Sequence, residues 1–159
     1  MKTSKTLALS ELLSPARMDL NLASKDRDGV LRELVDLIPE LADQPESRQT
    51  LLRALYEREE LHSTGIGDGI ALPHSRNPLV GLVDHPLMVF GRHAGGIPYG
   101  AIDSAPARLF FLVVAPTVTQ HLAVLARLTR VLNNPNVREG LLSAGTAEVV
   151  LELLRNAEK

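Results

Sequence analysis

The sequence predicts an α/β fold, a three-layer sandwich in which a mixed β-sheet is flanked by helices on both faces. Segment 109–115 (LFFLVVA) is apolar at every position, which is typical of a central strand covered on both faces. Helical and strand patterns alternate along the chain, as they do in α/β domains. The long non-helical stretch 70–100 indicates a hairpin, which makes the sheet mixed. A chain of 159 residues fits one domain, residues 1–159, with a core from about residue 9 to residue 154.

The N-terminal part is expected to hold one short strand and two helices. A helical turn at 9–13 and an alternating strand at 18–22 (MDLNL) come first. Ser24 is expected to cap the first helix, with Asp26 favourably placed near the positive end of that helix. Pro45 then begins a second helix, because proline is tolerated in a first helical turn.

The C-terminal part is expected to complete the sheet and add three helices. Residues 87–90 are predicted as a strand, and the glycine-rich stretch 91–100 as a turn or a bulged strand pair. After the central strand, Thr117 or Thr119 can cap a helix with an apolar inner stripe. Two short helices follow, at 137–144 and 146–156.

Composition excludes several classes of protein. Apolar residues make up 45% and charged residues 23%, a balance typical of globular domains, and no apolar run approaches the roughly 18 residues of a membrane span. Residues 1–14 lack the pattern of a signal peptide, so we expect a cytoplasmic protein without direct membrane insertion. The absence of cysteine excludes disulfides and thiolate zinc sites. A net charge of −2 and five aromatic residues argue against nucleic-acid binding.

The most informative segment is 63–76 (STGIGDGIALPHSR). Gly65, Gly67 and Gly69 free the backbone to curl and to approach a ligand closely. A short apolar run and a proline of fixed φ then lead to His74. Such a segment suits a nucleophilic imidazole held beside a concavity of backbone N–H groups, where an anion such as phosphate can sit.

Histidine can carry a phosphoryl group because one nitrogen of a neutral imidazole is nucleophilic near pH 7. The protein must fix the tautomer, here through a loop carbonyl on the other ring nitrogen, and must compensate the phosphoryl charge. For the charge, the candidates are the N–H groups of the three glycines, the Thr64 hydroxyl, Arg58 and His121. His121 is expected in the first turn of a helix, where the dipole and unpaired N–H groups favour phosphate. We therefore interpret the set as a phosphohistidine site.

Each assignment has a simpler alternative. Glycines also mark ordinary tight turns, and this segment has neither a dinucleotide-binding nor a Walker pattern. Arg58 lies among glutamates at a helix end, where a solvated charge is the default, and His121 can simply flank its helix. The remaining histidines are more easily explained as bystanders, the last two of them in loops: His62, His85 and His93.

A metal site is a further alternative. His62, His74 and His121, with Asp68 or Asp103, have the right donor atoms for zinc. However, no two histidines have the spacing that places two ligands on one helical face, and a nearby arginine disfavours a dication. We expect neither a metal nor an organic cofactor.

Several of these motifs together resemble a known family. The residues ERE at 57–59, followed by STGIGDGIALPH at 63–74, resemble the IIA domain of the mannitol/fructose class of the phosphoenolpyruvate-dependent phosphotransferase system. The match is closest to the nitrogen-regulatory branch of that class. Segments AID at 101–103, LFFLVVAP at 109–116 and the HL of 121–122 are similar to later landmarks of the family. The resemblance covers nearly the whole chain, from about residue 9 to residue 154.

The resemblance implies a mixed sheet flanked by helices and a cytoplasmic phosphotransferase component without metal or organic cofactor. It implies that His74 accepts, at Nε2, a phosphoryl group from a phosphorylated histidine carrier protein. Arg58 and His121 match the arginine and the second histidine that help to bind this group in the family. The domain would then donate to a IIB protein or act as a phosphorylation-dependent regulator of a target protein.

The chain departs from the family pattern at four positions. Ser75 stands where glycine often follows the active histidine, so its hydroxyl can reach the phosphoryl group or its bulk can narrow the opening. His62 stands where glycine is common and adds a titratable group near the site. Gly100 and Arg108 replace positions that often carry aspartate. The trio of Arg58, His74 and His121 is intact, which favours a working phosphocarrier.

The leading hypothesis is a free-standing IIA protein of nitrogen-regulatory type that is phosphorylated on His74 and acts mainly in regulation. One alternative is a transport subunit for a fructose- or mannitol-type sugar, which donates to a separate IIB protein. A second is a non-catalytic interaction module on the same fold, and a third is a metal hydrolase. The sequence leaves the donor, the acceptor, the sugar and the oligomeric state open.

Overall fold

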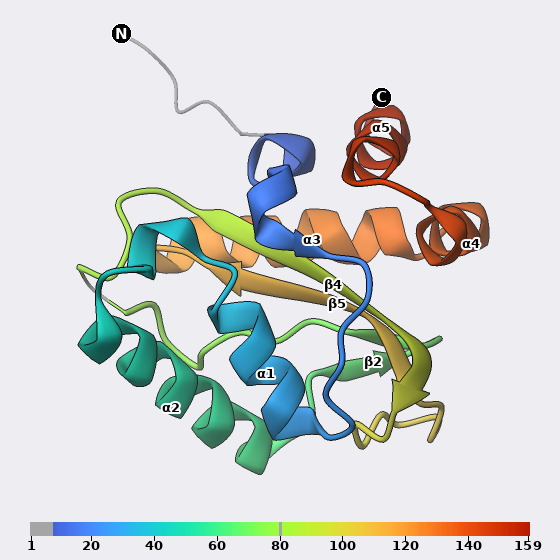
Figure 1. The fold of residues 1–159 in the computed structure, drawn as a ribbon. Coiled ribbons are helices and arrows are strands. Elements are labelled where there is room, and N and C mark those ends of the chain that lie inside the picture. Colours follow the sequence, from blue (N-terminus) through green and yellow to red (C-terminus); the bar gives the residue numbers. More distant parts are fainter. Residues whose placement is uncertain (1–7, 80) are drawn as a thin grey trace, which may run out of the picture.

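The computed structural model describes residues 8–79 and 81–159 and places a five-stranded mixed sheet between two layers of helices (Figure 1). The strand order is β1-β4-β5-β3-β2, which puts β5 at the centre. β4 pairs with β5 and β2 with β3 in antiparallel fashion, whereas β1 is parallel to β4 and β3 is parallel to β5. The strands are β1 (Met18–Asp19), β2 (Gly65–Gly67), β3 (Ile70–Ala71), β4 (Leu87–Ile97) and β5 (Ala107–Val114). The predicted α/β fold with a mixed sheet is confirmed.

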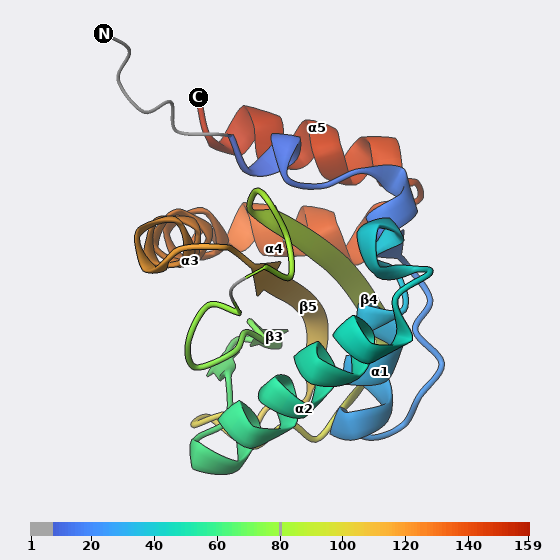
Figure 2. The same cartoon turned by 90° about the vertical axis from the view of Figure 1, so that its left-hand side faces the viewer.

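Helices α1 and α2 cover one face of the sheet, and α3, α4 and α5 cover the other (Figures 1 and 2). Within the described ranges, no helix has the length and apolar character needed to cross a bilayer. The helices are α1 (Arg27–Val35), α2 (Pro45–Leu61), α3 (Val118–Leu132), α4 (Pro135–Ser143) and α5 (Ala147–Ala157), with short 3-10 turns at Leu9–Glu11, Pro15–Arg17 and Pro39–Leu41.

The central strand separates two hydrophobic cores. Successive side chains of a strand point to opposite faces, so Phe111 packs with the α3–α5 layer and Phe110 with the α1–α2 layer. Phe111 stacks on Phe90 of β4 with 4.8 Å between ring centroids. Burial of each such ring stabilises the fold by roughly 2–3 kcal/mol. The prediction of a strand covered on both faces is confirmed, and it gives the site a rigid platform.

Two local predictions need correction. Asp26, and not Ser24, caps α1: its carboxylate accepts a hydrogen bond of 2.7 Å from Gly29 N. Ser24 is held just before the helix, because its own N–H donates to Glu33. The second correction concerns His93, which lies in a strand and not in a loop: β4 continues to Ile97 across a shift of register, so the bulged strand pair predicted as one alternative for 91–100 is present.

Candidate active site

His74 lies just beyond β3, where the chain still runs beside β5. The carbonyl of Pro73 accepts a hydrogen bond of 3.0 Å from Val113 N, so the segment between β3 and His74 remains attached to the central strand. β3 and β5 are parallel, and their carboxyl ends meet at the same edge of the sheet. The chain beyond β5 enters α3, which carries His121. Ligand sites of α/β sheets commonly form at such an edge.

The ring orientation of His74 follows from one hydrogen bond. Its Nδ1 lies 2.6 Å from the carbonyl oxygen of Leu72, two residues earlier. A carbonyl can only accept, so Nδ1 carries the proton and Nε2 of the neutral ring carries the lone pair. The predicted loop carbonyl is therefore present, and it leaves Nε2 as the nucleophilic nitrogen.

His121 faces the ring of His74. It is the fourth residue of α3, a helix capped by the Thr117 hydroxyl, which accepts from Gln120 N. The two imidazole centroids are 5.2 Å apart and the ring planes are inclined at 65°. The predictions of a helix after Thr117 and of His121 in its first turn are confirmed. The second ring is close enough to contact a group bound to the first.

The surroundings favour the neutral form of both imidazoles. Burial lowers the pKa of His74, the hydrogen bond to Leu72 opposes this effect in part, and the Arg58 charge lowers the pKa further. Burial also lowers the pKa of His121, and protonation of His74 would lower it further. A neutral ring is the nucleophilic form, so near pH 7 His74 is ready to attack an electrophile.

Arg58 supplies the positive charge of the site. It lies in the last turn of α2, and its Nη1 donates a hydrogen bond of 2.6 Å to the carbonyl of His62 at the end of that helix. With Ser75 and Arg76, which directly follow His74, it lines an open hollow of about 390 Å³. The guanidinium is near enough to His74 to act on its pKa. The structure thus brings Arg58, His74 and His121 to one place.

The glycine-rich segment forms a hairpin. Asp68 and Gly69 connect β2 to β3 with φ of 57° and 79°, as in a type I′ turn. The carboxylate of Asp103 accepts from Asp68 N at 2.9 Å and holds the turn in place. A side chain at Gly67 would meet this carboxylate, with its Cβ 3.0 Å from Oδ2. The glycines therefore allow a tight, braced hairpin beside the site.

This hairpin changes the expected role of the glycines. The N–H of Gly65 donates to the Ser63 hydroxyl at 2.9 Å and is not available to an anion. Gly67 pairs with Ile70 in the hairpin, and the carbonyl of Gly69 accepts from two residues of β5. Phosphate binding by the N–H groups of Gly67 and Gly69 stays a prediction.

The two hydroxyls expected near the phosphoryl group already have partners. The Thr64 side chain is buried and donates to the carboxylate of Glu59. The Ser75 side chain is also buried and donates to the carbonyl of Asn77 at 2.6 Å. Both protons point into the protein, so these residues support the loop around His74 in this structure.

Glu59 was not singled out by sequence reasoning, although a signal was present. The residue seemed part of a solvated helix end, yet it follows Leu51 and Leu55 at intervals of four and so falls on the buried stripe of α2. Its partner Tyr99 was missed as well, because it lies in a glycine-rich stretch without periodicity.

Of the residues considered for a metal site, His74 and His121 lie together, but the others do not join them. His62 is exposed at the end of α2, and Asp103 is engaged with the hairpin turn. In residues 8–79 and 81–159, no group of three or more histidine, aspartate or glutamate side chains is arranged to hold a metal ion.

The comparison with known families decides the classification. A family model described as "Phosphoenolpyruvate-dependent sugar phosphotransferase system, EIIA 2" matches residues 11–157. The chain belongs to this family. As an EIIA domain it is a component of a phosphotransferase system, as the sequence motifs implied.

Relatives of this EIIA domain include both transport and regulatory proteins. It is 32% identical over 155 residues to the fructose-specific EIIABC component of Bacillus subtilis (strain 168), covering 96% of this chain and 24% of the relative. The chain thus spans about a quarter of the length of that protein. It is also 32% identical over 151 residues to the nitrogen regulatory protein of Pseudomonas aeruginosa, covering 93% of this chain and 95% of the relative. Identity alone therefore does not separate the two roles.

The fold has a similar counterpart among solved structures. The crystal structure of the nitrogen regulatory protein IIA-Ntr from Neisseria meningitidis superposes with a TM-score of 0.80 at 28% identity. The match covers 91% of this chain and 97% of the other. The strand and helix arrangement described above is therefore that of an EIIA domain.

Proposed function

We propose that this EIIA domain is a phosphohistidine carrier that accepts a phosphoryl group on Nε2 of His74 from a phosphorylated histidine carrier protein. The observation that supports this most is the hydrogen bond from Nδ1 to the Leu72 carbonyl. It commits one nitrogen and leaves the other beside His121 and Arg58. We further propose a cytoplasmic location.

The transfer requires no change of protonation at His74. The lone pair of Nε2 attacks phosphorus, the new N–P bond forms, and the P–N bond to the donor histidine breaks. The donor nitrogen recovers the electron pair, and the proton stays on Nδ1 of His74, which donates its hydrogen bond to the Leu72 carbonyl. Catalysis then consists of positioning and of compensating the charge on the phosphoryl oxygens. Arg58 supplies a permanent charge, and His121 supplies a ring nitrogen for a hydrogen bond.

The surface around the site favours a protein as donor. Val118 and Leu122 lie on either side of His121 in α3 and are 57% and 59% exposed. Leu61, at the end of α2 beside Arg58, is 54% exposed. Apolar side chains exposed around a reactive group are typical of a surface that docks another protein.

For the acceptor we propose a regulatory target protein as the main role and a separate IIB protein as the alternative. The similarity to a free-standing nitrogen regulatory protein, matched over 95% of its length, supports the first. The similarity to a fructose-specific EIIABC component supports the second. The two are separated by offering the phosphorylated domain to a IIB protein of the same genome and measuring loss of the label.

The experiment that tests the function is reconstitution of the relay. The protein is incubated with the upstream enzyme, the histidine carrier and phosphoenolpyruvate, and its intact mass is measured. One acid-labile phosphoryl group is expected in the wild type and in the control His62→Ala, which changes an exposed neighbouring histidine. None is expected in His74→Ala. Labelling of His74→Ala would place the group elsewhere and contradict the proposal.

A further inference from the structure

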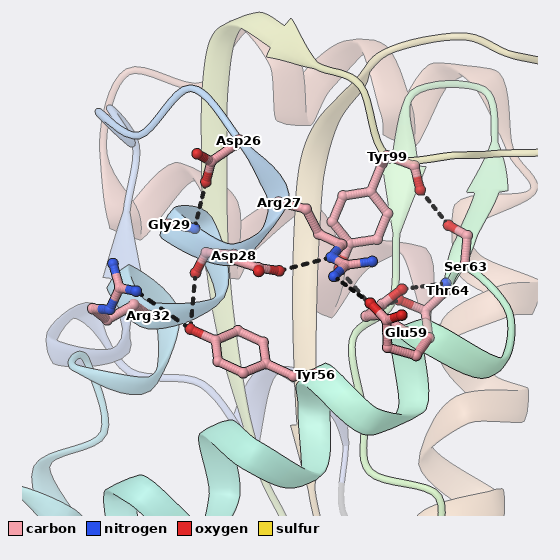
Figure 3. A network of polar contacts seen from close by, with 11 residues as sticks. Asp26, Arg27, Asp28, Gly29, Arg32, Tyr56, Glu59, Ser63, Thr64 and Tyr99 are labelled. Carbon is pink, nitrogen blue, oxygen red and sulfur yellow. Dashed lines mark hydrogen bonds and ion pairs between the residues drawn. The ribbon is translucent and has the colours of Figure 1, made fainter.

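A buried carboxylate, that of Glu59, lies near the end of α2 and faces Thr64 and Tyr99 (Figure 3). Glu59 is 5% exposed and is the residue next to Arg58. One of its oxygens accepts from the Thr64 backbone N–H at 2.8 Å. The other accepts from the Thr64 hydroxyl and, at 2.8 Å, from the Tyr99 hydroxyl.

The surroundings of this carboxylate form a built site. All three partners are donors, and an ionised carboxylate is the side chain that can accept from all of them. A buried carboxylate without such partners would cost several kcal/mol. Burial and the charge of Glu59 raise the pKa of Tyr99 well above its usual range, so the phenol keeps its proton and remains a donor. The ring of Tyr99 packs on Phe110 of the central strand, which anchors the network in the core.

The Thr64 end of the network continues to the reactive histidine. The N–H of Thr64 donates to Glu59, and the carbonyl of Thr64 accepts from Leu72 N at 3.0 Å. The carbonyl of Leu72 in turn accepts from Nδ1 of His74 at 2.6 Å. A chain of three hydrogen bonds therefore connects the Glu59 carboxylate to the imidazole through the backbone of two residues, Thr64 and Leu72.

We propose that Glu59 is a positioning residue that holds His74 in register with Arg58. The proposal rests on the phosphocarrier function proposed above. Arg58 and Glu59 are consecutive in the last turn of α2, so the carboxylate that fixes Thr64 also fixes the distance between the guanidinium and the β2–β3 hairpin. Through Thr64 and Leu72 it fixes the orientation and tautomer of the ring that must receive the phosphoryl group.

A purely structural role makes a different prediction. If Glu59 only stabilises the fold, any change that removes one of its hydrogen bonds should act on stability alone, and variants of equal stability should transfer at equal rates. If it positions His74, variants that break the link to Thr64 N–H should affect the histidine, and variants that leave this link intact should not.

Three variants separate these roles. Glu59→Met keeps the length of the side chain and removes both carboxylate oxygens, so the Thr64 N–H loses its acceptor. Tyr99→Phe keeps the ring on Phe110 and removes only the hydroxyl. Thr64→Val keeps the size of the side chain and its backbone N–H and removes only the hydroxyl.

The readouts are the ¹⁵N NMR signals of the His74 ring and the steady-state transfer from the phosphorylated carrier. For Glu59→Met we expect a mixture of the two neutral tautomers and a kcat about tenfold lower, with KM for the carrier within about twofold of wild type. For Tyr99→Phe and Thr64→Val we expect the wild-type tautomer and a kcat within about twofold, although urea titration shows both to be less stable.

A wild-type tautomer and rate in Glu59→Met would overturn the proposal. So would a loss of transfer in Tyr99→Phe as large as in Glu59→Met, since stability would then explain both. If Glu59→Met does not fold, a changed tautomer in Thr64→Val would overturn the proposal equally, because the hydrogen bond from the Thr64 N–H to Glu59 is intact there. The NMR comparison needs no donor protein, so it decides the role of Glu59 even if no carrier phosphorylates the wild type.

Discussion

His74 and His93 are both half-buried and both bond a backbone carbonyl through one ring nitrogen, but they differ at the other nitrogen. In His93, Nε2 lies 2.8 Å from the Ser24 carbonyl and Nδ1 accepts from Gly96 N at 3.0 Å. In His74, Nδ1 bonds the Leu72 carbonyl, and the described residues supply no hydrogen bond to Nε2. The comparison teaches that the nitrogen we propose as the acceptor is the one to which the described residues donate no hydrogen bond.

The hydrogen bonds of the two rings also span different distances along the chain. His93 joins β4 to the segment before α1, 69 residues away, and so acts as a cross-link of the fold. His74 bonds a carbonyl only two residues away. Its hydrogen bond costs the fold little if lost, and it serves to set the tautomer. We therefore expect the two histidines to respond to substitution in opposite ways.

The largest expected difference is in phosphorylation. His74→Ala should accept no phosphoryl group from the phosphorylated carrier, because its nucleophile is gone. His93→Ala should accept the group to wild-type stoichiometry, because both nitrogens it removes are structural. Intact mass spectrometry after incubation with the donor measures both. A phosphoryl group on His74→Ala, or no phosphoryl group on folded His93→Ala, would contradict the proposed difference between the two histidines.

The charge beside His74 gives the next largest effect. Arg58→Gln should lower the rate of phosphoryl transfer by about a hundredfold, because a guanidinium next to the transferred group stabilises its oxygens. The matched control is Arg53→Gln, an exposed arginine on the same helix, which should leave the rate within about twofold. Rapid-quench measurement of single turnovers compares the two. Equal transfer rates in Arg58→Gln and Arg53→Gln would show that Arg58 does not take part in the transfer.

Stability should change at the other histidine. His93→Ala should reduce the free energy of unfolding by about 1–2 kcal/mol, because two partly buried hydrogen bonds to the backbone are lost. His74→Ala should reduce it by less. Urea titrations of both variants measure the difference. A larger loss in His74→Ala would mean that the site histidine, too, is mainly structural.

The pH dependence should be the smallest effect. Burial and Arg58 hold the pKa of His74 below its ordinary value of 6.5, so the ring stays neutral and transfer stays constant as pH falls to that value. The rate should decline only at lower pH, where the ring is protonated. Because the unfolded chain binds this proton more readily than the folded one, stability is also lost as pH falls below 6.5.

The pH–rate profile of Arg58→Gln tests whether Arg58 contributes to the low pKa of His74. Removal of the guanidinium removes one of the effects that lower the pKa of His74, so the decline should begin at a higher pH than in the wild type. Initial rates between about pH 5 and pH 8 cover the range in which imidazoles titrate. A decline that begins at a lower pH in Arg58→Gln would contradict the proposed proximity.

Much of the fold could be predicted from the sequence because its signals are local. The uninterrupted apolar run of β5, the proline at the start of α2 and the threonine caps of α3 and α5 each act within a few residues. For the same reason His121 could be placed in the first turn of its helix. The cap of α1 could not be assigned in the same way, because Ser24 and Asp26 are both good caps and only the backbone conformation decides between them.

The parts that escaped prediction depend on residues distant in sequence. The glycine hairpin is braced by Asp103, 35 residues beyond Asp68, and no local pattern indicated that the Asp68 N–H would bond to it. Glycines surround His93, which indicated a loop, but pairing of β4 with β5 keeps this residue in a strand. Glu59 falls on the buried stripe of α2, but its partner Tyr99 lies 40 residues away, and no local pattern connects the two.

The central claim is that Nε2 of His74 is the acceptor atom, and NMR of the phosphorylated protein labelled with ¹⁵N tests it most directly. Coupling between phosphorus and a ring nitrogen identifies which nitrogen carries the group. The account predicts coupling to Nε2 of His74. Nδ1 should still carry its proton and donate it in a hydrogen bond to the Leu72 carbonyl. Coupling to Nδ1 of His74, or to a nitrogen of another histidine, would contradict it.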